Sequence, residues 1–104
     1  MTAHIAIETP DSPESDDWCN TIRKNFSLTL QPLGKQVKRV NIRLLRSRSH
    51  GVTSIFVGDL DVRTQQGKVA VRTQHADPDL AIAMAFSRAR RDILRSLGKR
   101  HVPQ

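Results

Sequence analysis

The stretch from Asp77 to His101 places the strongest constraint on the fold, because it combines a helix start, an apolar stripe and a run of basic residues. Asp77 has a side-chain oxygen suited to capping a free backbone N–H, and Pro78 suits the first helical position. Leu97 and Gly98 predict the helix end. The apolar residues recur at steps of three and four: Ile82, Phe86, Ala89, Ile93 and Leu97, with Ala85 and Leu94 widening the stripe. We expect an amphipathic helix of about 20 residues.

The side of this helix opposite the apolar stripe is basic. At about 100° per residue, four basic residues share one sector and two flank the stripe. They are Arg88, Arg91, Arg95 and Lys99 in the sector, and Arg90 and Arg100 at the flanks. A solvated helix usually pairs such residues with acids one turn away, but after Asp79 the only acid here is Asp92. Unpaired like charges repel, so the pattern favours polyanion binding over a merely solvated surface.

The charge of the whole chain is unevenly distributed. Its 104 residues include 17 Lys and Arg against 10 Asp and Glu, a formal net charge of +7. Residues 1–17 contain five acidic residues and no Lys or Arg, so residues 18–104 alone carry a net +12. A body this basic favours nucleic acid or an acidic membrane as a partner. The length predicts a single domain over residues 1–104, with loose ends at about 1–2 and 102–104.

Membrane insertion and disulfide bonding are both disfavoured. No apolar run approaches the roughly 18–20 residues that a membrane span needs, and the N-terminus lacks a signal-peptide pattern. The one cysteine, Cys19, excludes an internal disulfide and suits a reducing compartment. We therefore expect a cytoplasmic protein with no membrane partner.

Alternating and helical periods predict the elements of the first part of the chain. Residues 4–8 alternate polar and apolar side chains and predict a strand with Ile5 and Ile7 facing the core. A helix is expected from Ser12 or Ser15, whose hydroxyls suit capping. Its apolar face holds Trp18, Ile22, Phe26 and Leu30, and its basic residues Arg23 and Lys24 point to solvent.

Three strands are expected in the middle of the chain. The first alternates Val40, Ile42 and Leu44 with polar residues, and a polar connection over 46–51 follows it. The second covers 52–63 with a bulge at Gly58, and Gln66-Gly67 suits a two-residue hairpin turn before the third. The pairs expected from these turns are Val62 with Val71, Leu60 with Thr73, Asp61 with Arg72 and Asp59 with Arg39.

The element order predicts an α+β fold, β-α-β-β-β-α. The first strand–helix–strand unit should be a parallel crossover, and the last three strands should form an antiparallel meander. The result is a four-stranded mixed sheet with two helices packed on one face, because only one sheet face and the two helix stripes need burial. Both basic helix sides then point into solvent.

This order and three segments resemble the ribosome hibernation-promoting factors, also called ribosome-associated inhibitors or sigma-54 modulation proteins. The most specific likeness is at the start of the last helix, where an acid, a large residue and Ala-Ile precede spaced basic residues. Here these are Asp77, Leu80, Ala81 and Ile82, followed by Arg88, Arg91, Arg95 and Lys99. The segments VKRVNIRL and VGDLDV are similar to that family too.

The resemblance implies a short-form cytoplasmic protein that binds the small ribosomal subunit and silences translation in resting or stressed cells. It implies that 16S ribosomal RNA is contacted by the basic helical surface, formed by Arg88, Arg90, Arg91, Arg95, Lys99 and Arg100. The acid-rich segment 11–17 leaves only Arg23 and Lys24 as contacts from the first helix. Because the chain stops at Gln104, we expect no dimerisation domain of the long form.

No enzyme site is expected from the sequence. The histidines, at positions 4, 50, 75 and 101, are scattered, and a single cysteine adds no metal-ligand spacing. No Gly-rich phosphate loop is present. We expect neither a catalytic site nor a metal or cofactor.

Two other functions stay open. A double-stranded-RNA-binding module has a similar α-β-β-β-α layout, but it would need a basic helix start where this chain has Asp77 and Asp79. A protein-interaction module, including a homodimer, would use the sheet face without helices, where Leu45, Ile55 and Val57 are expected. The ribosome interpretation does not account for these apolar residues.

Overall fold

The computed structural model describes residues 4–49 and 53–100, in the element order that the sequence predicts. The elements are β1 (His4–Glu8), α1 (Ser15–Thr29), the 3-10 helix η1 (Gln31–Gln36), β2 (Val37–Ser49), β3 (Thr53–Thr64), β4 (Gly67–His75) and α2 (Pro78–Arg100). The strands form one four-stranded sheet in the order β1-β2-β3-β4. β1 pairs with β2 in parallel, and β2, β3 and β4 pair antiparallel. The predicted mixed sheet is confirmed. The loose ends expected at 1–2 and 102–104 lie outside the described residues.

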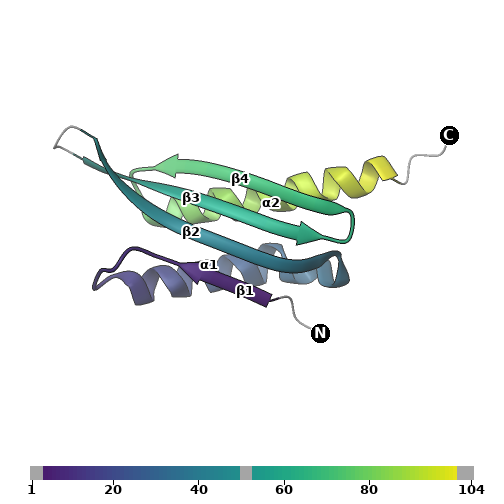
Figure 1. Cartoon of the computed structure of the whole chain (residues 1–104), viewed down its shortest axis with the longest axis horizontal. Coiled ribbons are helices and arrows are strands. Elements are labelled where there is room, and N and C mark those ends of the chain that lie inside the picture. The colour runs from purple at the N-terminus through teal and green to yellow at the C-terminus, as the bar shows by residue number, and fades with distance from the viewer. Residues whose placement is uncertain (1–3, 50–52, 101–104) are drawn as a thin grey trace.

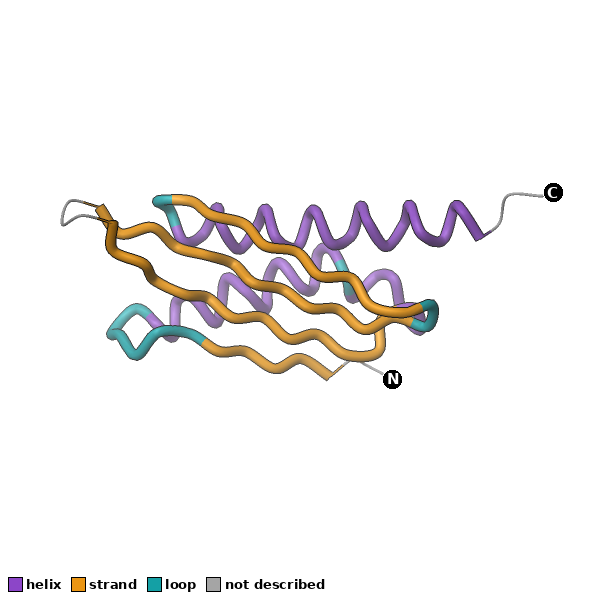
Figure 2. Tube along the Cα trace, turned by 45° about the horizontal axis from the view of Figure 1, so that its top comes forward, coloured by secondary structure: helices purple, strands orange, loops and turns teal. Residues whose placement is uncertain are grey.

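Both helices cover the same face of the sheet, as predicted, and the other face carries no helix (Figure 1). We call the uncovered side the outer face. The helices run in the same direction, and each begins at the end of the sheet where β1 and β4 finish (Figure 2). The described protein is therefore an elongated two-layer molecule, with principal extents of 54 × 28 × 18 Å.

The core lies between the sheet and the two helices. α1 buries Trp18, Ile22 and Phe26, and Leu30 directly after it is buried too. The buried residues of α2 are Ala81, Ile82, Ala85, Phe86, Ala89 and Ile93. The inward side chains of the sheet complete the cluster, among them Val40, Ile42, Leu60, Val62 and Val71. Each large apolar side chain buried here contributes about 1.5–3 kcal/mol. The predicted helix stripes are confirmed except at Leu94, which is 41% exposed.

The start of α2 is as predicted, but its end is not. The Asp77 carboxylate accepts the Asp79 backbone N–H at 2.9 Å, and the Asp77 carbonyl accepts the Ala81 N–H at 3.0 Å. The predicted end at Leu97-Gly98 is wrong, because α2 continues to Arg100. Gly98 does not adopt the positive φ that ends a helix, unlike Gly34 at φ 58°.

The capping predicted for α1 is wrong in detail. The helix begins at Ser15 behind Glu14, whose side chain makes no capping hydrogen bond. The Ser12 hydroxyl bonds within the turn that precedes the helix, where its oxygen accepts the Glu14 backbone N–H at 3.3 Å. The same hydroxyl donates to the Glu14 carboxylate. This local bonding orders the turn before the helix rather than the helix itself.

Strand β2 is longer than predicted, whereas β3 has the predicted length and ends at Thr64 rather than at residue 63. Residues 46–49 were expected in a loop, but they belong to β2 and pair with β3 as far as Ser49 with Thr53. The rest of the predicted connection, 50–51, lies outside the described residues. The pairing with β3 continues without a register shift through this part of β2, and so the backbone remains in the sheet although its residues are polar.

The β3–β4 turn lies one residue earlier than predicted. Gln65 and Gln66 form it, and Thr64 pairs with Gly67. The Thr64 hydroxyl accepts the backbone N–H groups of Gln66 at 3.2 Å and of Gly67 at 3.1 Å, which stabilises this turn.

The earlier turn shifts the pairing register by two residues. The observed pairs are Val62 with Val69, Leu60 with Val71, Asp61 with Ala70, and Asp59 with Arg72 on one side and Arg43 on the other. The three pairs predicted across this turn are therefore wrong, and the predicted pair of Asp59 with Arg39 is wrong because the β2–β3 register places Arg43 opposite Asp59. The prediction that the valines and Leu60 share one face holds, because a shift of two residues leaves each side chain on its face.

The β-bulge predicted at Gly58 is also wrong, because the irregularity lies in β2 instead. Gly58 pairs regularly with Leu44 and Thr73, and the register shift lies between Val37 and Arg39. Gly58 is needed for close packing, since a Cβ there would lie 2.8 Å from the Thr73 hydroxyl oxygen and 3.0 Å from the Ala81 carbonyl oxygen.

Candidate nucleic-acid interface

The outward side of α2 carries three exposed arginines, Arg88, Arg91 and Arg95, which we call the arginine face. Burial of Phe86 and Ile93 on the opposite side fixes the rotation of the helix, so these arginines cannot turn inward. With a rise of about 1.5 Å per residue, they are separated by about 4.5 and 6 Å along the axis. The side chains of Lys99 and Arg100, also predicted as contacts, lie outside the described part of the chain.

The arginine face has no acidic partner within residues 4–49 and 53–100. The ion pairs found among the described residues join Arg43 to Glu8 and Lys68 to Asp61, and both lie on the sheet. Arg88 donates to the backbone carbonyl of Arg72 at 3.4 Å, a long bond at the β4 edge. Arg91 and Arg95 therefore keep their full donor capacity for a ligand.

Arg90 has a different environment from the rest of the predicted set. It is half-buried between the helices, and its Nη1 donates to the Thr29 carbonyl at 3.0 Å, at the end of α1. That carbonyl has no intrahelical partner, so the bond satisfies it and ties the two helices together. The structure thus separates Arg90 from the exposed arginines. Arg23 and Lys24 are exposed on α1, as predicted.

Two apolar residues missed by the sequence analysis extend the arginine face toward the start of α2. Leu80 is 46% exposed and Met84 is 40% exposed. Met84 also lines an open hollow of about 360 Å³ with Ala83, Ser87, Arg88 and Arg91. Steps of four from residue 80 through 84 to 88 would have placed both residues on the basic side rather than in the stripe. The surface therefore combines apolar contact area with guanidinium donors.

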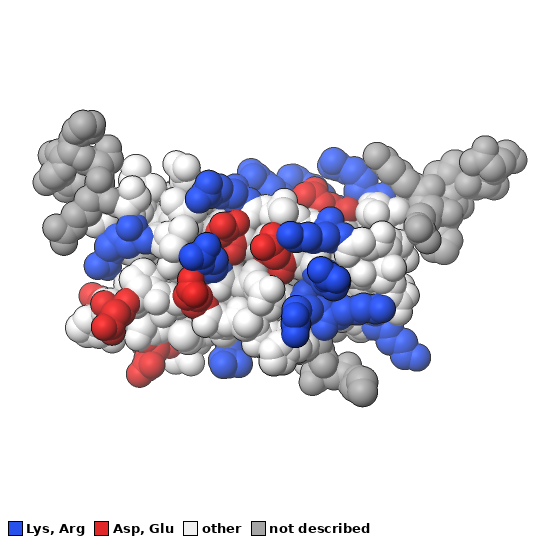
Figure 3. Space-filling model, viewed as in Figure 1, with Lys and Arg blue, Asp and Glu red and all other residues white. Residues whose placement is uncertain are grey.

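Six of the ten acidic residues gather at the end of the molecule where both helices begin. Because both helices start at one end, the acids near their first turns lie there together: Asp11, Glu14, Asp16, Asp17, Asp77 and Asp79. The Thr21 hydroxyl donates to the Asp79 carboxylate at 3.3 Å and links the two starts. Hydrogen bonding from Ser12 lowers the pKa of Glu14, which keeps this carboxylate ionised. Lys and Arg dominate the other end of the face seen in Figure 3.

The middle of the outer face is electrically balanced. One row across all four strands alternates in sign, through Glu8, Arg43, Asp59 and Arg72, and we call it the mixed row. Arg43 Nε donates to Glu8 Oε2 at 2.7 Å, and this bond raises the pKa of Arg43. Opposite charges facing each other across strands favour this register, although exposure to solvent weakens the attraction.

The apolar residues expected on the outer face form only a small patch. Val57 pairs with Leu45 and lies outside the main core cluster, as expected for the outer face, but it is only 8% exposed. Leu45 and Ile55 are half-buried. The expectation that Val57 is exposed is wrong, and the contact area left for a partner is small.

Other types of site have little support in the described residues. No group of three His, Cys, Asp or Glu side chains within residues 4–49 and 53–100 is arranged to hold a metal ion. His75 Nδ1 accepts the Asp77 N–H at 2.9 Å, and Cys19 is a half-buried free thiol. His50 and His101 lie outside the described residues. Neither described helix is sufficiently long and apolar to traverse a membrane.

Fold and surface together define a small basic α+β protein with an exposed arginine face. Solved structures of the same fold include a ribosomal subunit interface protein from Coxiella burnetii, with a TM-score of 0.73, 10% identity, and coverage of 91% of this chain and 98% of that chain. Another is the N-terminal domain of Thermus thermophilus Protein Y, with a TM-score of 0.68, 17% identity, and coverage of 92% and 99%. The resemblance inferred from the sequence is confirmed at the level of the fold. No protein-family model and no curated protein matches the sequence.

Proposed function

We propose that this protein is a cytoplasmic, ribosome-associated translation inhibitor that silences ribosomes in resting or stressed cells. It binds 16S ribosomal RNA of the small subunit through the arginine face of α2. The observation that carries this proposal is the exposure of Arg91 and Arg95 without acidic partners in the described part of the chain, on a helix whose rotation is fixed by its buried side. The fold shared with a ribosomal subunit interface protein supports the choice of the ribosome as the partner.

The chemistry of this surface suits RNA phosphates rather than bases. Guanidinium groups bind phosphate oxygens through paired N–H donors, and counterions released from the RNA drive the association. All four aromatic side chains of the chain are buried, namely Trp18, Phe26, Phe56 and Phe86. Stacking on exposed bases is therefore not the mode of binding, and recognition rests on the backbone and shape of the RNA.

The predicted contact residues take unequal parts in this proposal. Arg91 and Arg95 bind phosphates directly, and Lys99 and Arg100 are kept as further contacts on the strength of the sequence alone. Arg90 holds α2 against α1 through Thr29, so it positions the arginine face instead of contacting RNA. Arg23 and Lys24 add a smaller contribution from α1.

The competing interpretations have weaker support. The starts of both helices are acidic, which disfavours a double-stranded-RNA module that binds with a helix N-terminus. The outer-face patch around Val57 offers little exposed apolar area for a homodimer.

The test is co-sedimentation with 30S subunits in a sucrose gradient at stepped salt. The variant Arg91→Gln/Arg95→Gln should leave the ribosomal fractions at a lower salt concentration than wild type. The matched control is Arg43→Gln/Arg72→Gln, which removes the same charge from the mixed row and should remain bound. Both pairs are exposed, so folding is retained in each variant.

Equal losses in the two variants would show a diffuse attraction by net charge and would overturn the arginine face as the docking surface. A wild-type protein that stays at the top of the gradient at low salt would overturn the ribosome itself as the partner.

A further inference from the structure

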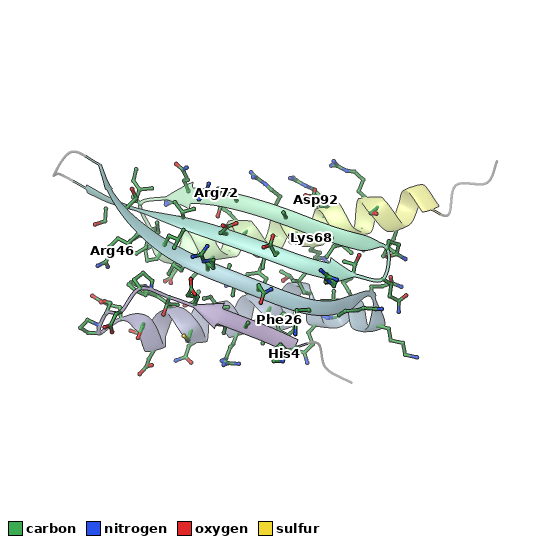
Figure 4. The ribbon with its side chains drawn as sticks, viewed as in Figure 1. His4, Phe26, Arg46, Lys68, Arg72 and Asp92 are labelled. Atoms are coloured by element: carbon green, nitrogen blue, oxygen red, sulfur yellow. The ribbon has the colours of Figure 1, made fainter. Side chains whose placement is uncertain are left out.

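A second row of the outer face has a charge pattern unlike that of the mixed row. His4, Arg39, Arg63 and Lys68 occupy directly paired positions on β1, β2, β3 and β4, and we call them the cationic row. Neighbouring strands lie about 4.8 Å apart, so the row spans roughly 14 Å across the sheet. Figure 3 shows Lys and Arg gathered over this end of the outer face, and Figure 4 places Lys68 and Arg72 apart along β4.

The β-bulge is what turns Arg39 toward this row. Without it, Arg39 would share a face with Val37, two residues away, which is buried in the core. Val37 pairs with Thr64 and Arg39 pairs with Arg63, so Lys38 is the extra residue between them. The bulge thus directs Val37 inward and Arg39 outward, the kind of re-aiming for which bulges are retained near binding sites.

The cationic row destabilises the sheet when no ligand is present. Arg39 lies directly opposite Arg63, and Arg63 opposite Lys68. Like charges at such positions repel across the strands, whereas the mixed row of the same sheet alternates in sign. The one ion pair at this end, between Lys68 Nζ and Asp61 at 3.9 Å, leaves both arginines unbalanced. Sheet stability therefore gives no reason for this arrangement.

The row borders a hollow sized for a phosphate group. Arg39, Arg63 and Lys68 line it with Asn41 and Asp61, around about 110 Å³. Three cations face one carboxylate, so the hollow is electropositive, and the exposed guanidinium groups of Arg39 and Arg63 enter it from adjacent strands. Paired guanidinium donors match the oxygens of a phosphodiester.

We propose that the cationic row is a second RNA-phosphate site, on the face of the molecule opposite the arginine face. The choice of RNA as the ligand rests on the proposed function, in which the arginine face of the same molecule binds RNA. With one site on α2 and one on the outer face, a single molecule binds two RNA strands and bridges them. An acidic protein segment is the other chemistry that such a row would accept.

The experiment titrates the isotope-labelled full chain with a short RNA duplex of mixed sequence, and follows backbone amides by NMR and stoichiometry by sedimentation. Wild type should bind two duplexes, with shifts both on α2 and at 39, 41, 63 and 68. Arg39→Gln/Arg63→Gln should lose the shifts on the sheet and bind the second duplex at least about tenfold more weakly. Arg91→Gln/Arg95→Gln should lose the shifts on α2 alone, and the mixed-row control Arg43→Gln/Arg72→Gln should lose neither.

Thermal melting gives an independent readout. Because Arg39→Gln/Arg63→Gln removes a repulsion, it should melt at or above the wild-type temperature without RNA, and RNA should raise its melting point less than that of wild type. One bound duplex with shifts confined to α2 would overturn the second site and leave the proposed function intact. Shifts at the row with poly-glutamate but not with RNA would also overturn it. Two bound duplexes without co-sedimentation with 30S subunits would contradict the proposed function and retain the site.

Discussion

Thr73 donates its hydroxyl to the backbone carbonyl oxygen of Ala81 at 2.7 Å, and this buried bond joins the last strand to the first turn of α2. The same carbonyl oxygen would lie only 3.0 Å from a Cβ added to Gly58. β3, β4 and α2 thus meet at one point with no spare volume. The position of the helix on the sheet, and with it the direction of the arginine face, depends on this contact.

The first prediction concerns this contact. Gly58→Ala should destabilise the protein by about 1–3 kcal/mol, because the added methyl group forces Thr73 or α2 to move. In a Thr73→Ala background the same change should cost less, because the nearest atom has been removed. Urea unfolding of the four proteins in this cycle measures the coupling, and strictly additive values would contradict the packing described.

The second prediction concerns the core. Phe86 is fully buried, so Phe86→Ala should cost about 3–5 kcal/mol. For a protein of this size the melting temperature should fall by at least about 12 °C. Leu94→Ala is the matched control on the same helix, and its 41% exposure predicts a loss below about 1 kcal/mol. Calorimetry that found similar losses for the two variants would show the helix rotation to be wrong.

The third prediction uses the only tryptophan of the chain. The Arg46 guanidinium lies 5.4 Å from the Trp18 ring centre and 5.0 Å from that of Phe56, and the rings meet edge to face (Figure 4 labels Arg46). Arg46→Gln should lower stability by about 0.5–1 kcal/mol and change the Trp18 emission spectrum. Arg23→Gln, an exposed change on α1, should leave the emission unaltered.

The fourth prediction concerns pH. Hydrogen bonding from Ser12 lowers the pKa of Glu14 below its ordinary value of 4.5. A carboxyl whose pKa is lower in the folded state stabilises the fold above the unfolded pKa, and this contribution disappears as the pH falls through the folded pKa. Ser12→Ala should therefore melt below wild type at neutral pH, and the difference should shrink in acid. NMR titration should show the pKa of Glu14 rising in the variant; an unchanged pKa would contradict the cause given.

The fifth prediction is the salt dependence of RNA binding at the arginine face. If about four phosphates are neutralised along α2, the slope of log K against log salt should be about −2.8 to −3.6, at about 0.7–0.9 per phosphate. Arg91→Gln/Arg95→Gln should reduce the magnitude of the slope by about 1.4–1.8. Fluorescence anisotropy in the Arg39→Gln/Arg63→Gln background isolates this face, and an unchanged slope would show that these arginines do not contact phosphates.

The sequence was sufficient for element type, order and core, because each depends on side-chain periodicity. The stripe of α2 and the alternation of β2 both follow from which positions must be buried. The pairing register of β3 with β4 was not predictable in the same way, because it depends on the position of the turn that joins them. The sequence predicted a two-residue turn at Gln66-Gly67, whereas the hydrogen bonds of the Thr64 hydroxyl stabilise a turn one residue earlier.

The candidate site was predicted only in part, because periodicity shows which residues face outward but not which elements pack together. Periodicity placed Arg91 and Arg95 outside, but it carried no information on the bond between Arg90 and Thr29, which arises only when α1 and α2 pack. Arg39 and Arg63 were missed as a pair because their juxtaposition needs both the correct register and the bulge after Val37. Long-range pairing, rather than local pattern, created the second surface.

The shared direction of α1 and α2 places six carboxylates at one end of a molecule 54 Å long, and Lys and Arg dominate the other end of the outer face (Figure 3). Such a charge separation exerts a torque in the field of any anionic surface, in addition to the pull on the net charge of +7. If RNA is the partner, as proposed, the molecule should turn before contact and approach with its basic end leading. Its acidic end should then face away from the RNA, because approach in the reverse orientation is opposed by repulsion before any specific contact is made.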